Sequence, residues 1–477
     1  MRIERTHRVA IALTAMLAGC VTPVERATPP AVALSAAALE SARTLSGSRD
    51  GQWPQGRWWE AFGDAQLDSL VEEALAGHPS LRVARARLAQ AQALVDAAVS
   101  NATLGTTGSL DLTRQRYSVS GTVPPPVAGT TRTNIRMALD LGYEIDFAGR
   151  NDAAIAAARA AEASLAADVY AARLALSSTV ARTYFQLQRL FALNAIALRE
   201  LAQYERRVEL TRQRVAAGLE TEAVLNRVQA VPPELRADIA QTQAAVAIAR
   251  HQLAALAGKG PDRGLAIASA QSNAAAVPLP ENLPLDLIGR RPDLAAARWR
   301  AESAARDIEV ARARFLPNVN LLAFVGIAAL GIDRLFEGGS GIAGAGPAIR
   351  LPLFAAGGLQ ASLRGREADY DLAVERYNEL VLDAVREVAD QAQALRSLDV
   401  ERNERRQALA ALERAYRLAL ERNQAGIAST LEVLEAEAGL FPLQRSDADL
   451  RVRGLQAEVG LFRALGGGYE DGRTRTD

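Results

Sequence analysis

The clearest pattern in the first half of the chain is a segment in which apolar and charged residues alternate. Between positions 135 and 147 every odd position carries an apolar or aromatic side chain, and the charged residues occupy even positions only. Such a period of two is typical of a β-strand with one apolar and one polar face. The segment at 104–117 alternates more weakly, and a loop rich in glycine and proline connects the two. We expect a β-hairpin over residues 103–147.

The second half contains a comparable pair of segments, at residues 318–325 and 345–354, joined by a glycine-rich stretch. We expect a second hairpin over residues 317–354. Strands that cross an outer membrane are about 10 residues long, apolar toward lipid and polar toward the lumen, and these segments fit that description. Single-chain barrels start at about eight strands, so four strands must share a barrel with other copies of the chain. Two hairpins packed on a soluble core are the alternative.

Long stretches without helix-breaking residues follow each hairpin. Residues 151–217 contain neither proline nor glycine, and residues 360–425 contain one glycine near their start. About 65 helical residues span roughly 100 Å at 1.5 Å per residue. Helices of this length need lateral partners, so coiled-coil packing is expected. We predict one helix before each hairpin, followed by two long helices and two shorter ones, at 149–217, 220–257, 358–425 and 428–465.

Markers recur at a nearly constant offset, which indicates an internal duplication. His-Pro-Ser-Leu at 78–81 corresponds to Arg-Pro-Asp-Leu at 291–294, and Ala217-Gly218 corresponds to Ala425-Gly426. The predicted organisation is an N-terminal anchor and linker at 20–57, a first repeat at 58–258, a connector at 259–284, a second repeat at 285–466 and a C-terminal tail at 467–477.

Prolines interrupt the shorter helix of each repeat. Pro232 and Pro233 lie inside the helix expected at 220–257, and Pro442 falls at nearly the matching point of the second half. A proline in a helix interior removes a backbone hydrogen bond and kinks the helix. We therefore expect a bend at both places.

Residues 1–19 resemble a bacterial signal peptide. Arginines precede a short apolar run, which is too short to span a bilayer as a helix, and small residues follow it. Leu-Ala-Gly-Cys, ending at Cys20, resembles the lipobox, in which cleavage before the cysteine frees it for acylation. A spare cysteine in an ordinary signal peptide is the alternative. Val21 is not the aspartate that retains lipoproteins in the inner membrane, so we expect sorting to the outer membrane.

Charge and candidate chemistry argue against other classes of function. Basic and acidic residues balance, and no basic block of the kind that binds nucleic acid is present. His7, His78 and His251 lack metal-ligand spacing, and there is no second cysteine for a thiolate site. Neither a nucleophile elbow nor a phosphate-binding loop occurs. We expect no enzyme, no metal, no nucleic-acid partner and no cofactor other than covalent lipid.

Several motifs, taken in order, resemble those of the TolC-type outer-membrane factors, and within them the acylated NodT-like branch. They are spread over nearly the whole mature chain, and their order makes the resemblance specific. They are WWEAFGD at 58–64, YEIDFAGR at 143–150, RRPDL at 290–294, FLP at 315–317, LPLF at 351–354 and LFRALGGGY at 461–469.

This resemblance implies an internally duplicated α+β membrane protein. Its homotrimer would have a twelve-stranded barrel, with four transmembrane strands from each subunit, continued by a long helical tunnel in the periplasm. The implied function is a passive exit duct for drugs or other small molecules. The implied partners are a periplasmic adaptor (membrane fusion) protein and an inner-membrane pump, of the resistance-nodulation-division type in the acylated branch.

The resemblance also implies how the protein is held in the cell outer membrane. Cys20 would carry N-palmitoyl and S-diacylglycerol groups, and the chain would extend from this anchor into the periplasm. Two other functions remain open from the sequence. One is the exit duct of a type I system that secretes polypeptides. The other is a non-channel periplasmic scaffold lipoprotein, which needs the helices and the anchor but no strands facing lipid.

A closed tunnel needs an end that opens, and the ends of the long helices are the candidates. We predict left-handed C-caps at Gly218 and Gly426. Arg214, Glu421 and Arg422 lie just before these tip glycines. In a symmetric assembly such charges repeat around the axis, where they can form intersubunit ion pairs or a charged ring. We therefore predict a periplasmic gate at these three residues; a solvated helix face is the alternative.

Overall fold

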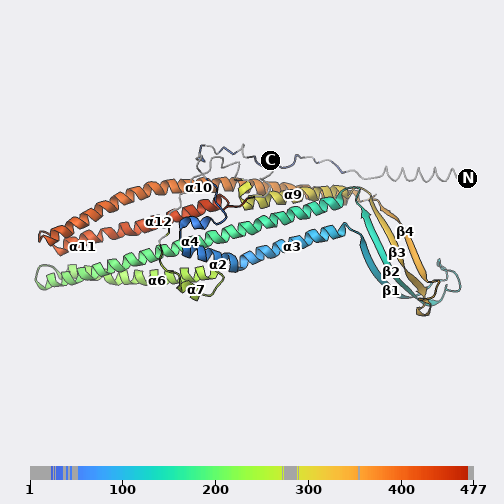
Figure 1. The fold of residues 1–477 in the computed structure, drawn as a ribbon, viewed down its shortest axis with the longest axis horizontal. Coiled ribbons are helices and arrows are strands. Elements are labelled where there is room, and N and C mark those ends of the chain that lie inside the picture. Colours follow the sequence, from blue (N-terminus) through green and yellow to red (C-terminus); the bar gives the residue numbers. More distant parts are fainter. Residues whose placement is uncertain are drawn as a thin grey trace. The chain divides into compact units, whose positions relative to one another are not determined.

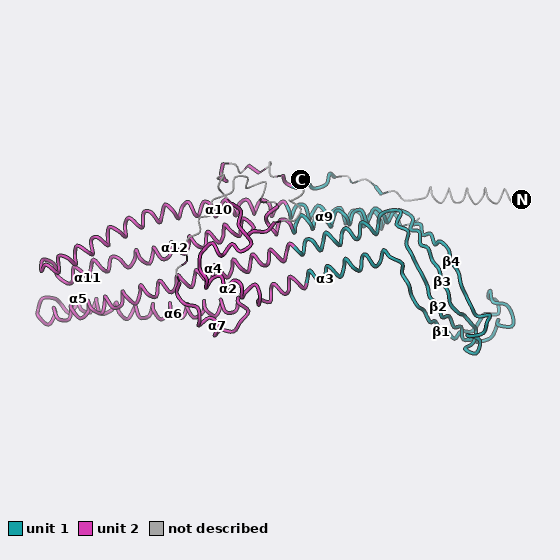
Figure 2. Tube along the Cα trace, viewed as in Figure 1, with its two compact units in different colours: residues 1–33, 87–166, 296–377 teal, residues 34–86, 167–295, 378–477 magenta. Residues whose placement is uncertain are grey.

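The computed structural model describes residues 23–24, 26, 28–35, 39–40, 43–45, 52–270, 272, 287, 289–352 and 355–470. The chain divides into two compact units, which Figure 2 colours separately. Unit 1 contains residues 87–166 and 296–377 together with the described residues up to 33, and unit 2 contains the rest. The predicted signal peptide and Cys20 lie outside the described residues.

One antiparallel sheet of four strands lies at one end of unit 1 (Figure 1). Its strands follow the order of the sequence: β1 (Gly105–Arg116), β2 (Thr131–Ile145), β3 (Asn318–Leu330) and β4 (Gly341–Arg350). Both predicted hairpins are present, and pairing of β2 with β3 joins them into a single sheet.

The second hairpin differs in its strand ends from the pattern in the sequence. β3 continues to Leu330, past the predicted end at 325, and β4 begins at Gly341 rather than at 345. The extra residues are mostly alanine and glycine, whose small side chains give no contrast between the two faces. A short 3-10 helix, η3 (Ile332–Arg334), lies in the turn between these strands.

The register gives the sheet one continuous apolar face. Met137 lies between Leu110 and Ile327, and Leu139 lies beside Val325. Several large apolar side chains of this face are more than half exposed in the single chain: Leu110, Leu112, Val325 and Ile349. An uncovered apolar surface of this kind marks contact with lipid or with another chain.

A capped corner joins β2 to the long helix α4 (Arg150–Ala216). The carboxylate of Asp146 accepts hydrogen bonds from the backbone amides of Arg150 (2.7 Å) and Asn151 (2.9 Å), which starts the helix. The side chain of Arg150 returns to Glu144, 2.6 Å away. Glu144 and Asp146 of the motif at 143–150 therefore hold the junction at which strand β2 ends and helix α4 begins.

Helices account for most of the remaining described chain. The two longest, α4 and α10 (Ala356–Gln424), have 67 and 69 residues. The others are η2 (Trp58–Phe62), α2 (Ala65–Gly77), α3 (Pro79–Asn101), α5 (Glu222–Gln229), α6 (Val231–Leu256), α7 (Asp262–Leu265), α9 (Pro292–Ala313), α11 (Thr430–Ala438) and α12 (Leu440–Ala464).

The main apolar core belongs to unit 2 and is aromatic. The ring centroid of Phe62 lies 5.0 Å from that of Phe185 and 5.9 Å from that of Phe462, and Trp58 lies 5.4 Å from Phe462. Phe62 and Trp59 are almost fully buried. Edge-to-face packing of such rings adds to the stabilisation from their burial. The tryptophan motif at 58–64 thus joins η2 to α4 and α12.

A buried carboxylate organises the polar part of this core. Asp64 caps α2 by accepting from the amides of Gln66 (3.0 Å) and Leu67 (3.2 Å). Its other oxygen accepts from the hydroxyls of Tyr184 and Ser272, each at 2.7 Å. Burial and the hydrogen bond to Asp64 raise the pKa of Tyr184. One carboxylate therefore links α2, α4 and the segment that follows α7.

The prolines follow an interruption in each of the two expected helices, where a single residue with helical dihedral angles, Ala230 or Gly439, separates two helices; the bend itself stays a prediction. Pro232 and Pro233 lie in the first turn of α6, which begins directly after α5 ends, and Pro442 lies in the first turn of α12. The amide of a residue in the first turn has no acceptor within the helix, so proline costs no hydrogen bond there. The interruption is a break between two helices.

Replacing Asp64 tests the importance of the buried carboxylate. Asp64→Ala removes the cap of α2 and leaves two buried hydroxyls without an acceptor, so we expect the free energy of unfolding to fall by about 2–4 kcal/mol. Thermal unfolding in detergent, followed by circular dichroism, measures the change. Ser69→Ala, at an exposed position of the same helix, is the control. Equal midpoints for the two variants would contradict this account.

A second prediction concerns pH. Hydrogen bonds from Arg263 and Lys259 lower the pKa of Glu73 to about 2, from an ordinary value of 4.5. A lowered carboxyl pKa stabilises the fold above pH 4.5, and this stabilisation is lost as the pH falls toward 2. Glu73→Gln should therefore destabilise by about 1–3 kcal/mol at pH 7 and progressively less below pH 4.5.

The measurement is the thermal midpoint of Glu73→Gln and of the parent chain across this pH range. Glu72→Gln, a change at a half-exposed neighbour, is the control and should have little effect at any pH. A loss that is independent of pH would show that the charge of Glu73 is not what stabilises the contact.

Candidate functional site

The face of the sheet opposite the apolar one carries charged side chains that are joined by ion pairs and hydrogen bonds. The guanidinium of Arg136 lies 2.6 Å from a carboxylate oxygen of Asp140 and donates to the hydroxyl of Ser109 at 2.9 Å. Asp111 lies 4.0 Å from the same guanidinium. The alternation of β2 therefore separates a charged surface from an apolar one, as the sequence predicted.

The first helical tip is formed by the end of α4. Gly218 has φ +68°, in the left-handed region, and its amide donates to the carbonyl of Val215. The amide of Leu219 donates to the carbonyl of Arg214 at 2.8 Å. This pair of hydrogen bonds is the C-cap predicted for the glycine. Thr221 then caps α5.

The second tip, at the end of α10, repeats this geometry. Gly426 has φ +76°, and the amide of Ile427 donates to the carbonyl of Arg422 at 2.9 Å. Ser429 and Glu432 form a capping box at the start of α11. The internal duplication thus produces two similar turns from one local rule.

The predicted gate charges behave differently from one another in the single chain. Arg214 lies 4.0 Å from Glu220 of the same turn, and its Nε atom is buried without a hydrogen-bond partner. Glu421 and Arg422 are exposed, and they make no ion pair within the described part of the chain. The structure therefore pairs Arg214 locally and leaves the other two charges available to another chain.

Each tip also presents an exposed aliphatic side chain directly after its glycine. Leu219 is 67% exposed and Ile427 is 69% exposed. Neither residue is among those predicted from the sequence. Their signal is the position after the left-handed glycine, where a side chain usually packs back onto the helix.

An N-terminal segment lies along α10 within unit 1, and its contacts were not foreseen from the sequence. The backbone amide of Val24 donates to the side-chain oxygen of Gln360 at 3.0 Å, and the side-chain amide of Gln360 donates to the carbonyl of Val24 at 3.3 Å. Farther along, Asp371 pairs with Arg26 and accepts from the amide of Ala31 at 2.9 Å. The hydrogen bond from Arg26 lowers the pKa of Asp371. We call the described residues 23–24, 26 and 28–31 the strap.

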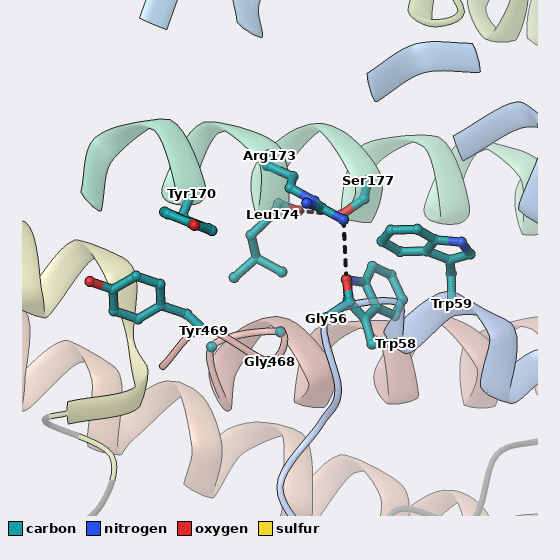
Figure 3. Close-up of a pocket in the computed structure, with 11 residues that line it drawn as sticks. Gly56, Trp58, Trp59, Tyr170, Arg173, Leu174, Ser177, Gly468 and Tyr469 are labelled. Atoms are coloured by element: carbon teal, nitrogen blue, oxygen red, sulfur yellow. Dashed lines mark hydrogen bonds between the residues drawn. The ribbon is translucent and has the colours of Figure 1, made fainter. Parts of the chain in front are cut away.

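A cavity in unit 2 is too small to hold a substrate (Figure 3). Its volume is about 60 Å³, roughly that of two water molecules. The rings of Tyr170 and Tyr469 meet at one side with centroids 5.2 Å apart, and Arg173 donates to the carbonyl of Gly56 at 3.5 Å. The cavity is a packing gap between α4 and the glycine-rich end of α12.

Two searches of the described residues gave negative results. No group of three or more histidine, cysteine, aspartate or glutamate residues in the described ranges is arranged to hold a metal ion. None of the helices in the part of the chain that the structure describes combines the length and the apolarity needed to cross a bilayer.

Comparison with known proteins places both repeats in one family. The family described as outer membrane efflux protein matches residues 70–259 and 283–467. The fusaric acid resistance protein FusA of Burkholderia cepacia is 36% identical over 364 residues, covering 75% of this chain and 68% of that protein. The multidrug resistance outer membrane protein MdtP of Shigella flexneri is 30% identical over 465 residues, covering 96% and 95%.

A solved structure agrees with these relatives. The outer membrane protein VceC of Vibrio cholerae superposes with a TM-score of 0.80 at 36% identity, covering 88% of this chain and all of that one. The predicted resemblance to TolC-type channels is confirmed, whereas the acylated NodT-like branch stays a prediction. The matched proteins are channels, not enzymes. The chain is thus an outer-membrane exit duct for efflux, and it belongs to the outer membrane efflux protein family.

Proposed function

We propose that this duct is a lipid-anchored homotrimer that passively carries small organic molecules from an inner-membrane pump and its adaptor to the cell exterior. The open sheet carries the proposal. Within the described residues, β1 and β4 each pair with one neighbour only, so both edges of the sheet are free to pair with other copies. Backbone groups inside a bilayer must be paired, and closing the sheet on itself achieves this.

The two faces of the sheet support a closed barrel with a wet interior. The apolar face is exposed in the single chain, and the charged face carries Arg136 and Asp140. Closing three copies with the charged face inward gives twelve strands, lipid on the outside and a polar lumen. A periplasmic scaffold lipoprotein would gain nothing from this apolar face, so the geometry favours the channel.

The strap supports the lipid anchor at Cys20. Its contact with Gln360 lies one helical turn into α10, close in sequence to the end of β4 at Arg350. Cys20 precedes Val24 by four residues, which span at most about 14 Å. An N-palmitoyl, S-diacylglycerol cysteine at this place would enter the inner leaflet of the outer membrane beside the barrel strands.

The tips support contact with an adaptor protein. Proteins of this family work as trimers with an adaptor and an inner-membrane pump. Leu219 and Ile427 are apolar, exposed and held by rigid turns, while Glu421 and Arg422 supply unpaired charges next to them. Such a surface suits another protein. The pump is of the resistance-nodulation-division type if the acylated branch applies.

Small organic molecules are the proposed cargo because of the names of the relatives. FusA is named for resistance to fusaric acid and MdtP for multidrug resistance. A type I duct for polypeptides has the same architecture, but no feature of the described residues favours it over small-molecule efflux.

Labelling with palmitate tests the anchor. We expect the parent chain to incorporate the fatty acid and Cys20→Ser to lose it entirely. Asp371→Ala, which removes one of the two attachments of the strap to α10 but keeps the cysteine, should remain labelled. Label on the Cys20→Ser chain would contradict acylation at this residue.

Single-channel recording tests the gate. Glu421→Gln with Arg422→Gln removes charges that can pair between subunits at three places in a trimer, and each such surface pair contributes about 0.2–1 kcal/mol, so we expect the open probability to rise about threefold or more. Arg212→Gln, which breaks the pair with Glu209 in the same helix, is the matched control. Open probabilities unchanged in Arg214→Gln, and also in Glu421→Gln with Arg422→Gln, would rule out the charged gate.

A further inference from the structure

Strand β3 carries large apolar side chains on both of its faces. Leu322 is in register with Gly142, and Phe324 is in register with Asp140, which places both on the face that carries Arg136. Leu322 is 49% exposed and Phe324 is 38% exposed. Apolar side chains left open on a charged face call for an explanation, because their exposure to water is unfavourable.

The neighbouring strands leave room around these two side chains. Leu322 has a glycine on each side, Gly142 on β2 and Gly346 on β4, and Phe324 has Gly344 on β4. A Cβ atom on Gly344 would lie 2.7 Å from two ring carbons of Phe324, so the ring lies directly against the backbone of β4. The glycines therefore contribute no side chains of their own here, and the ring packs on the backbone of β4 while Phe324 remains 38% exposed.

The surrounding charges favour a positively charged ligand. The guanidinium of Arg136 lies over the ring of Phe324, with its central carbon 5.8 Å from the ring centroid, and it forms an ion pair with Asp140, so a ligand has to meet the part of the ring that stays exposed. Asp111, also near Arg136, has a side chain that is 68% exposed. One positive and two negative charges leave the group with excess negative charge. An aromatic ring attracts cations over its face and stacks with other rings.

We propose that Leu322 and Phe324 form a contact site for the aromatic part of a translocating organic cation, repeated once in each subunit. We call these two residues the β3 platform. The inference rests on the proposed function, because the platform faces the lumen when the sheet closes with its charged face inward. The three platforms of a trimer would lie at the same level along the channel axis. They would give the otherwise polar, water-filled lumen a preference for amphipathic solutes.

A purely structural role for the ring makes different predictions. An aromatic side chain across from a glycine can stabilise a sheet by covering the exposed backbone. In that case the loss of Phe324 lowers the stability of the trimer and leaves solute contact unchanged. The contact site predicts the reverse, because a solute meets the exposed part of the ring and not the part that packs on Gly344.

Block of single-channel current measures contact with a solute directly. The probes are benzyltrimethylammonium, tetramethylammonium and benzenesulfonate, applied to the acylated trimer in planar bilayers. We expect benzyltrimethylammonium to block at lower concentration than either of the others, because it alone combines a ring with a positive charge. The double change Leu322→Ser and Phe324→Ser should weaken this block about three- to tenfold, the effect of losing one stacking or cation–π contact.

Two further variants separate contact from folding. Val325→Ala changes the neighbouring residue on the opposite face and should leave the block unchanged. Phe324→Leu keeps an apolar side chain over Gly344 but removes the ring, so it should weaken the block by the aromatic cation while the heat stability of the trimer on gels stays that of the parent. This variant keeps the test valid if the double variant fails to assemble.

Three results would overturn the proposal. One is equal block of the parent channel by all three probes. The second is block by benzyltrimethylammonium that is unchanged in a stable Phe324→Leu trimer. The third is a trimer that conducts neither in the parent form nor as Glu421→Gln with Arg422→Gln, which contradicts the duct itself and with it the platform, whereas conductance without selective block contradicts the platform alone.

Discussion

The structure depends on one constraint: a sheet with two free edges cannot remain open inside a bilayer. β1 and β4 each leave one row of backbone amides and carbonyls without a partner in the described chain. In hydrocarbon such groups cost several kcal/mol each, roughly, unless they are paired. Edge-to-edge pairing between copies satisfies both rows at once, so assembly is part of folding and not a later event. The apolar face of the sheet has the same requirement, since it is uncovered until lipid surrounds the barrel.

Away from the sheet, the same local capping interactions occur in both repeats and set where the helices begin and end. Each long helix ends at a left-handed glycine, and each following helix starts at a hydroxyl cap, Thr221 or Ser429. The large side chains are concentrated elsewhere, in the aromatic core around Phe62 and in the polar network of Asp64. A duct needs no reacting groups, so its specificity has to come from surfaces: the helical tips toward partners and the charged face of the sheet toward solutes.

Much of this could be predicted from patterns within a few residues of one another. The alternation of β2 gave its two faces, and the Ala-Gly pairs gave both C-caps. Contacts between distant residues gave no such signal. Asp64 contacts Tyr184 and Ser272, which lie 120 and 208 residues farther along the chain. Arg26 contacts Asp371, 345 residues away. Nothing in the local sequence around any of these residues indicates its partner. The prolines predicted the place of both helix interruptions, but the sequence alone does not tell a proline at a bend from a proline in the first turn of a new helix. The alternation could not be followed to the end of β3 or to the start of β4, because the alanine and glycine residues there differ little in polarity between the two faces.

Single-particle imaging of the detergent-purified, acylated protein tests the central claim most directly. The account predicts a three-fold particle whose detergent belt surrounds a closed barrel of twelve strands, with β4 of each subunit bonded to β1 of the next and the face of Arg136 toward the lumen. A monomeric particle, or a trimer whose four-stranded sheets stay separate, would contradict it.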